Sequence, residues 1–179
     1  MNYSTIKYEV EESIALITLS RPEKLNSFTI EMSNELIDAF QKGSEDDDVG
    51  AIIVTGAERA FCAGMDLDPN LDNVFGLDET IKPTLDDMRE KISDPKIHHG
   101  VRDAGGKVVL SIYECKKPVI AAINGAAVGI GATMTCAMDI RFVSTKAKIG
   151  FVFNKIGITP EACSSWFLPK LVGFQTALE

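Results

Sequence analysis

The stretch that organises this chain is Val119–Asp139, which reads VIAAINGAAVGIGATMTCAMD. An apolar run of β type, 119–123, stops at Asn124-Gly125, and small residues then follow as in the first turns of a buried helix. Glycines at 125, 129 and 131 leave the backbone uncovered there. Such a helix start offers unpaired N–H groups and the positive end of the helix dipole. A negatively charged ligand oxygen can be held against this main chain, so the stretch is the candidate reactive centre.

The composition indicates one ordered globular domain. The chain has 179 residues, of which 45% are hydrophobic and 25% are charged, and this is enough to bury a core. Its formal net charge of −8 argues against a nucleic-acid surface, which would need clustered Lys and Arg. No cysteine or histidine spacing typical of a metal site is found, so no metal is expected.

Cysteine usage and the N-terminus bear on location. The four cysteines lie far apart without a CxxC pair, so reduced thiols in a reducing compartment are expected. No signal-peptide pattern opens the sequence, and no apolar run approaches the ~18 residues of a membrane span. We therefore expect a soluble, cytoplasmic protein that binds neither membrane nor nucleic acid.

The first third of the chain has the pattern of an α/β protein. Ile6–Val10 and Ile14–Leu19 predict a β-hairpin. Thr29 is placed to cap a helix that runs through about Lys42 and ends at Gly43, with apolar residues at four-residue steps on one face. A buried strand, Ala51–Thr55, follows an acidic loop.

The rest of the chain alternates similarly around one irregular segment. Residues 68–106 are polar and poorly periodic, and we interpret them as a variable insertion or lid with one short helix near 85–92. The further predicted elements are a helix over 108–113, the strand over 119–123, a strand over 140–144, a short apolar segment over 148–153 and a helix over 164–172 interrupted by Pro169.

Several kinds of chemistry can be weighed from the motifs. A dinucleotide-binding loop is disfavoured, because Met134 stands where the third glycine would be, and no Walker lysine follows the glycines. Cys62 has no sequence cue for a partner base. Two backbone turns remain, at 62–64 and 129–131, each after an apolar strand. If they converge, they supply two N–H donors to one oxygen, as in an oxyanion hole; tight packing is the alternative explanation.

Four linked motifs resemble the enoyl-CoA hydratase/isomerase, or crotonase, superfamily. They are Arg21-Pro22 with Asn26, AFCAGMDL (60–67), KPVIAAINGAAVGIGATMTCAMDIR (117–141) and GITPEACSSWFLPKLVG (157–173). The resemblance covers nearly the whole chain in the family's motif order. It implies an α/β fold built as a crotonase-like spiral of ββα units.

The resemblance also implies a ligand and a site. The ligand is an acyl-CoA thioester, whose CoA is part of the substrate, so no separate cofactor is expected. The oxyanion hole would be formed by the N–H groups of Ala63 and Ile130. The implied substrate or CoA contacts are Lys24, Ser27, Ala63, Gly64, Met65, Asp66, Leu67, Gly129 and Trp166, with Lys24 as a phosphate partner and Asp66 either on the adenine side or structural.

The expected reaction follows from a departure from the family pattern. The two glutamates that hydratases of this family use align with Thr133 and Phe153, which cannot move a proton at neutral pH. The next carboxylate, Glu161, resembles the base of Δ3,Δ2-enoyl-CoA isomerases. We expect Glu161 to shift the double bond of 3-enoyl-CoA to the 2-position, with Trp166 and Phe167 raising its pKa by desolvation. Water addition to 2-enoyl-CoA is the alternative.

The last residues suggest a chain that stops early. Relatives of this family continue beyond position 179 into helices that cover the acyl site and build a trimer. We therefore expect a core domain, 1–179, truncated before the trimerisation helices, which would form a homotrimer or hexamer if that part is present. An inactive acyl-CoA-binding fragment is the third hypothesis, and a C-terminal peroxisomal signal stays open.

Overall fold

Apolar alternation at the N-terminus produces the hairpin predicted from the sequence. Strand β1 (Ile6–Glu11) pairs antiparallel with β2 (Ile14–Leu19). The connecting residues Glu12 and Ser13 both have positive φ, 49° and 63°, the backbone of a type I′ turn. Such a turn matches the twist of the two strands, so the register is set locally.

The computed structural model describes residues 3–68, 70, 73–78, 80–91 and 93–179.

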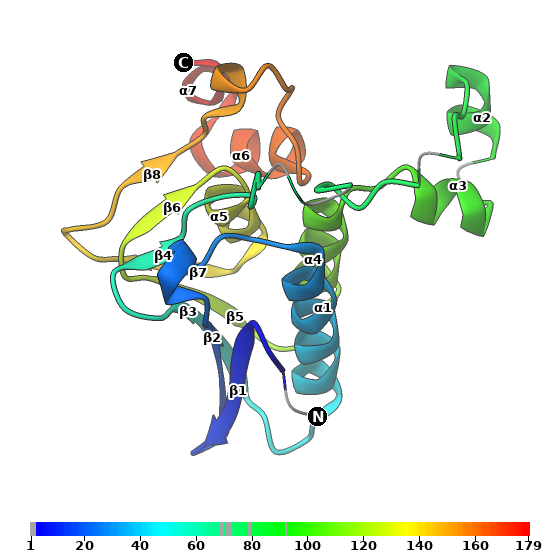
Figure 1. The fold of residues 1–179 in the computed structure, drawn as a ribbon. Coiled ribbons are helices and arrows are strands. Elements are labelled where there is room, and N and C mark those ends of the chain that lie inside the picture. The colour runs from blue at the N-terminus through cyan, green and yellow to red at the C-terminus, as the bar shows by residue number, and fades with distance from the viewer. Residues whose placement is uncertain (1–2, 69, 71–72, 79, 92) are drawn as a thin grey trace.

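The hairpin forms one side of a five-stranded sheet in the order β1-β2-β3-β5-β7 (Figure 1). The three further strands are β3 (Ala51–Gly56), β5 (Val119–Ile123) and β7 (Ile140–Val143). The pairs β2–β3, β3–β5 and β5–β7 are parallel. Parallel neighbours need crossover connections, and helices supply two of them.

Helices α1 (Ile30–Glu45) and α4 (Ala104–Tyr113) pack against each other beside this sheet (Figure 1). The hydroxyl of Thr29 accepts from Met32 N at 3.1 Å and caps α1 as predicted. The prediction that Gly43 ends α1 is wrong, because the helix continues to Glu45. Gly43 is needed inside the helix, since a Cβ atom there would lie 2.9 Å from Ile52 Cδ1 of β3.

Helix α4 begins earlier than the sequence predicts. The predicted start at Val108 is wrong, because Gly105 and Gly106 lie in the first turn of the helix and not in the preceding loop. The carboxylate of Asp103 accepts from Gly106 N at 2.8 Å, which satisfies a donor that the helix start would otherwise leave unpaired. The cap thus offsets the low helix propensity of two adjacent glycines.

A second, smaller sheet carries the two glycine-rich turns. Its parallel strands are β4 (Ala60–Cys62), β6 (Ala126–Val128) and β8 (Ile149–Gly150), in the order β4-β6-β8. The predicted strand 119–123 is β5, and the small residues after it form β6 before a helix begins. That helix, α5 (Ile130–Thr133), passes directly into the 3-10 turn η2 (Met134–Ala137).

The remaining elements are short. They are η1 (Pro22–Lys24), α2 (Leu85–Glu90), α3 (Pro95–Gly100), η3 (Phe153–Lys155), α6 (Ser164–Val172) and α7 (Phe174–Leu178). The predicted helix near 85–92 is confirmed as α2, although residue 92 lies outside the described residues, and α3 was not predicted. Both stand apart from the two sheets in Figure 1. Pro169 does not interrupt α6, because the Ser165 carbonyl that loses its donor is exposed to solvent.

The two sheets are joined by a buried amide. Asn26, which is 0% exposed, has φ 55° and accepts from Arg21 N at 2.9 Å. Its Nδ2 donates to the carbonyl oxygens of Ala57 and Ala60 at 2.9 and 2.8 Å. Asn26 therefore ties the turn after β2 to the connection between β3 and β4. None of the helices in the described part of the chain combines the length and apolar character needed to cross a bilayer.

We predict that Asn26→Ala lowers the free energy of unfolding by about 2–4 kcal/mol, because three hydrogen bonds between backbone groups and this side chain are lost and alanine tolerates the positive φ at position 26 less well than asparagine. Urea denaturation measures this change. Asn34→Ala, at an exposed position of α1, is the matched control and should stay within about 0.5 kcal/mol of the wild type. Equal effects of the two substitutions would contradict the structural role of Asn26.

Candidate functional site

The two glycine-rich turns meet, as the sequence led us to expect. A Cβ atom on Gly131 would overlap the carbonyl oxygen of Cys62, and one on Gly64 would lie 3.2 Å from the carbonyl oxygen of Val128. Backbone therefore packs directly on backbone at this point. Tight packing does not exclude an oxyanion hole here. The close approach of the two backbone segments brings N–H groups of both segments to one place.

A cavity of about 110 Å³ opens beside the two turns. Its lining is apolar apart from backbone groups and one carboxylate, the usual character of a small-molecule site. The residues around it are Ala63, Gly64, Met65, Leu67, Phe75, Val128, Gly129, Ile130, Val152, Phe153, Ile156, Ile158 and Glu161. Five of the predicted ligand contacts, together with the predicted base and Ile130, thus surround one space.

The backbone N–H groups of Ile130 and Met65 at this cavity make no hydrogen bond within the described part of the protein. Among the hydrogen bonds of the described residues, none uses the N–H of Ile130 or that of Met65. Ile130 is the first residue of α5, where a helix leaves its N–H unsatisfied. Met65 forms a parallel bridge with Phe28, in which Gly64 O and Asp66 N make the bonds, so the intervening Met65 N–H lies on the other side.

The structure corrects the predicted partner donor. The N–H of Ala63 donates to the carbonyl oxygen of Leu25 at 3.1 Å, so it is already engaged inside the protein. Ala63 still borders the cavity, but as a wall residue. An N–H group without an internal partner among the described residues lies two residues further along the same turn, at Met65.

Glu161 is the single ionisable side chain among the described residues that line this cavity. Burial raises the pKa of its carboxyl to about 7, and the neighbouring charge of Asp103 acts in the same direction. The hydroxyl of Thr133 donates to Glu161 Oε1 at 3.2 Å and opposes this rise. At neutral pH, Glu161 therefore exists in both protonation states, as a group that removes and returns a proton must.

The side chain of Glu161 is held where a glycine leaves room for it. A Cβ atom on Gly105 would lie 3.1 Å from Glu161 Oε2, 3.0 Å from Asp103 Oδ1 and 2.7 Å from Ile130 Cδ1. The start of α4 thus brings a second carboxylate close to Glu161. Asp103 was not anticipated at the site; the signal that could have revealed it is its position as a helix cap before Gly105-Gly106.

The prediction that Trp166 and Phe167 surround Glu161 is wrong, whereas a contact of Trp166 with CoA stays a prediction. Trp166 is 59% exposed, and the Lys170 ammonium lies 3.3 Å from the centre of its ring. Neither residue lines the cavity around Glu161. Phe167 packs on Tyr113 with ring centres 5.6 Å apart. The rise in the pKa of Glu161 was predicted correctly, but its apolar surroundings come from α5 and the 152–158 turn instead of α6.

The positions aligned with the two family glutamates do lie at the site. Thr133 is fully buried in α5 and holds Glu161 through its hydroxyl. Phe153 forms part of the cavity wall. The prediction that Thr133 and Phe153 replace two proton-moving groups is consistent with these places.

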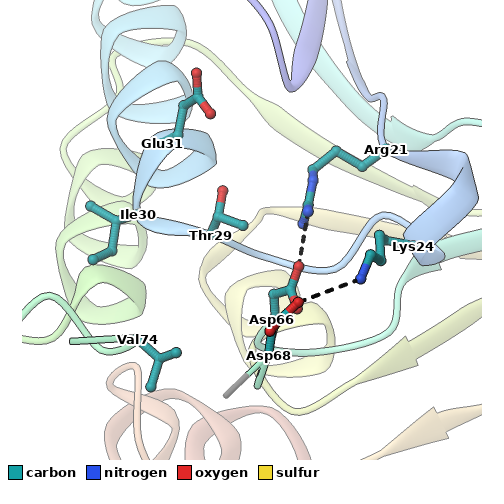
Figure 2. A pocket seen from close by; sticks show the side chains of 8 residues that line it. All are labelled: Arg21, Lys24, Thr29, Ile30, Glu31, Asp66, Asp68 and Val74. Atoms are coloured by element: carbon teal, nitrogen blue, oxygen red, sulfur yellow. Dashed lines mark hydrogen bonds and ion pairs between the residues drawn. The ribbon is translucent and has the colours of Figure 1, made fainter. Parts of the chain in front are cut away.

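A second cavity, of about 340 Å³, is lined by both charged residues that were predicted to contact CoA, Lys24 and Asp66 (Figure 2). Arg21 Nη2 lies 2.8 Å from Asp66 Oδ2, and this contact holds the pKa of Asp66 below its usual range. Lys24 Nζ lies 3.9 Å from Asp68 Oδ2, and both side chains are partly exposed. Arg21 is therefore fixed in an ion pair, whereas Lys24 can exchange its partner for a ligand phosphate.

The segment 65–68 separates the two cavities. Met65 and Leu67 line the cavity of Glu161, whereas Asp66 and Asp68 line the charged one. This alternation is that of an extended chain, whose successive side chains point to opposite sides. Ser27 is buried and donates to Asp66 Oδ2 at 3.3 Å, so it supports Asp66 and is not itself a lining residue.

Comparison with known proteins identifies the family to which this fold belongs. A family described as enoyl-CoA hydratase/isomerase matches residues 14–178. An enoyl-CoA hydratase of Alternaria alternata, ACTT3, is 40% identical over 167 residues, which cover 93% of this chain and 50% of that protein. A 1,2-epoxyphenylacetyl-CoA isomerase of Escherichia coli K12 is 34% identical over 169 residues, covering 94% and 58%.

Solved structures agree with this match. A probable enoyl-CoA hydratase/isomerase of Mycobacterium abscessus superposes with a TM-score of 0.76 at 30% identity, covering 96% of this chain and 58% of that one. The architecture is thus that of the crotonase superfamily. Within it, the chain belongs to the enoyl-CoA hydratase/isomerase family. The chain spans about half the length of the first curated relatives that it matches.

We predict that Asp103→Asn and Thr133→Val shift the pKa of Glu161 in opposite directions. Asp103→Asn removes the neighbouring negative charge while keeping a helix cap, so the pKa falls. Thr133→Val removes the hydrogen bond that favours the carboxylate, so the pKa rises. Carbon-13 NMR titration of the glutamate carboxyls measures both, with the Glu161 signal identified by its loss in Glu161→Gln. Asp94→Asn, which changes the cap of α3, is the control and should shift nothing.

Proposed function

We propose that this chain binds an acyl-CoA thioester and shifts the double bond of a 3-enoyl-CoA to the 2-position. The observation that carries the proposal is one cavity that is lined both by a carboxylate with a pKa of about 7 and by residues 65 and 130, whose backbone N–H groups are unengaged among the described residues. One base and one oxyanion hole suffice for this reaction, which belongs to fatty-acid metabolism.

The thioester carbonyl would lie against the N–H groups of Met65 and Ile130. When the proton at C2 leaves, negative charge moves onto the thioester oxygen, and two preorganised donors stabilise it. Removal of one such donor raises the barrier by ~3–4 kcal/mol in other enzymes. The positive end of α5 adds little, since the helix has only one turn, so the two individual N–H groups supply most of the effect.

Glu161 would carry the proton from C2 to C4. In its ionised form it takes the C2 proton, and the electron pair left behind forms a dienolate over C1 to C4. The protonated Glu161 then gives the same proton to C4, and the double bond is left between C2 and C3. A pKa near neutrality serves both half-steps, because the group neither holds nor releases the proton too strongly.

Hydration of 2-enoyl-CoA is the second candidate, and two observations favour it. Several relatives carry the name enoyl-CoA hydratase, and Asp103 offers a second carboxylate beside Glu161. Asp103 does not line the cavity, however, and its oxygen is engaged in capping α4. The site therefore supports direct proton transfer by Glu161 better than it supports hydration, which needs a water molecule held between two carboxylates.

Assembly and location remain proposals that rest on the resemblance. A homotrimer or hexamer, a cytoplasmic location and CoA as the only cofactor-like group are what the family leads us to expect. An acyl-CoA-binding chain without turnover is the outcome that the following experiments would detect.

We predict that Glu161→Gln lowers the rate of isomerisation by about 10²–10⁴-fold, the usual contribution of a general base. The purified chain is supplied separately with 3-hexenoyl-CoA and 2-hexenoyl-CoA, and the double-bond shift and water addition are followed by chromatography. The exposed Glu114, outside the cavity, provides the control Glu114→Gln, which should retain full activity. Water addition alone would establish hydration instead, and binding without either reaction would establish the inactive hypothesis.

We predict opposite effects on CoA affinity from the two members of the loose ion pair at the charged cavity. Lys24→Ala should weaken binding of acyl-CoA a few-fold, because it removes a phosphate partner, and more so at low salt. Asp68→Asn should strengthen binding, because it frees Lys24 and removes a negative charge. Isothermal titration calorimetry at two salt concentrations measures both, with Lys7→Ala on β1 as the control. Equal acyl-CoA affinities of all three variants would show that Lys24 does not contribute to acyl-CoA binding.

A further inference from the structure

A third cavity, of about 210 Å³, lies next to the one that contains Glu161. It is mainly apolar, and its principal lining side chains are Phe151, Phe153, Leu168, Pro169, Phe174 and Leu178. Nothing in the proposed proton transfer uses this space. Its chemistry suits hydrocarbon and offers no charged group to a ligand.

Phe153 is the one residue, among the described residues, that lines both this cavity and the cavity of Glu161. Phe153 therefore lies where the two cavities meet, and we take its ring as the partition between them. It is only 9% exposed, and its ring lies 6.4 Å from that of Phe151, centre to centre. Its carbonyl oxygen accepts from the N–H groups of Ile156 and Ile158 at 3.2 and 3.1 Å, which fix the backbone that carries the ring.

The reacting end of a substrate is confined to one side of this partition. Glu161 faces the smaller cavity, while its neighbours Pro160 and Ser164 line the other. With the thioester at Met65 and Ile130 and the carbons C2 to C4 at Glu161, an acyl chain that fills the smaller cavity has its next carbons at Phe153.

We propose that Phe153 determines acyl-chain length: its ring confines the wild-type chain to short acyl groups, and the apolar cavity behind it takes the distal carbons once the ring is made smaller. This inference rests on the proposed acyl-CoA function and names the substrate class within it, short-chain acyl thioesters.

The test uses binding of saturated acyl-CoAs, which cannot react. Affinities for butanoyl-CoA and octanoyl-CoA are measured by calorimetry for the wild type, Phe153→Ala, Phe153→Leu and Phe151→Ala. The wild type should bind octanoyl-CoA no more tightly than butanoyl-CoA. Phe153→Ala should raise the ratio of octanoyl-CoA to butanoyl-CoA affinity by about tenfold, the effect of burying two further methylene groups. Phe153→Leu should change it in the same direction by less.

Phe151→Ala is the matched control. It also removes a phenyl ring from the lining of the third cavity, but it leaves the ring of Phe153 in place between the two cavities. Its affinity ratio should equal that of the wild type. The inference is overturned if Phe153→Ala leaves the ratio unchanged, or if Phe151→Ala changes it as much. Thermal melting checks folding, and Phe153→Leu decides the question if Phe153→Ala does not fold.

The outcomes also separate this inference from the proposed reaction. If the chain binds saturated acyl-CoAs with the expected length dependence but turns over no enoyl-CoA, the reaction fails and the role of Phe153 stands. If the wild type binds neither acyl-CoA, both are overturned.

Discussion

The direct approach of two backbone segments, 62–65 and 129–131, is the constraint on which the rest of this structure depends. No side chain can stand between Gly131 and the carbonyl oxygen of Cys62. The approach requires a small sheet, β4-β6-β8, that carries both segments in parallel. It also requires α5 to start directly after β6, the middle strand of that sheet, where the first N–H of the helix has no internal partner in the described part of the chain. The geometry that excludes side chains thus leaves main-chain donors for a ligand.

A second constraint acts on Glu161, where three effects determine proton affinity. Burial and the charge of Asp103 disfavour the carboxylate, whereas the hydroxyl of Thr133 stabilises it. The three groups come from separate parts of the chain: the start of α4, the end of α5 and the segment before α6. Their positions relative to one another depend on Gly105, whose missing side chain lets α4 approach Glu161. The proton affinity of the Glu161 carboxyl therefore depends on how these elements pack together.

Much of the fold and part of the site can be predicted from the sequence. The hairpin, the cap at Thr29 and the strand before Asn124 follow local rules of alternation and capping, and the structure confirms them. The predicted end of α1 and the predicted start of α4 are wrong, because tertiary contacts override the low helix propensity of glycine there. Gly43 and Gly105 lie inside the helices, where neighbouring side chains occupy the space that a Cβ atom would take. Ala63 was a reasonable donor by motif, but the bond to Leu25 O is a contact between distant segments. Asp103 was missed for the same reason, since nothing near it in the sequence relates it to Glu161.

Asp103 also links substitutions in the cavity wall to the proton affinity of Glu161. It stands at the end of the segment 68–106, which contributes Phe75 to the cavity wall, and Ala104 N donates to Phe75 O at 2.8 Å. Substitutions that move Phe75 therefore also disturb the position of the Asp103 carboxylate beside Glu161. One backbone contact at a helix cap thus joins a residue of the cavity wall to the group whose charge raises the pKa of Glu161.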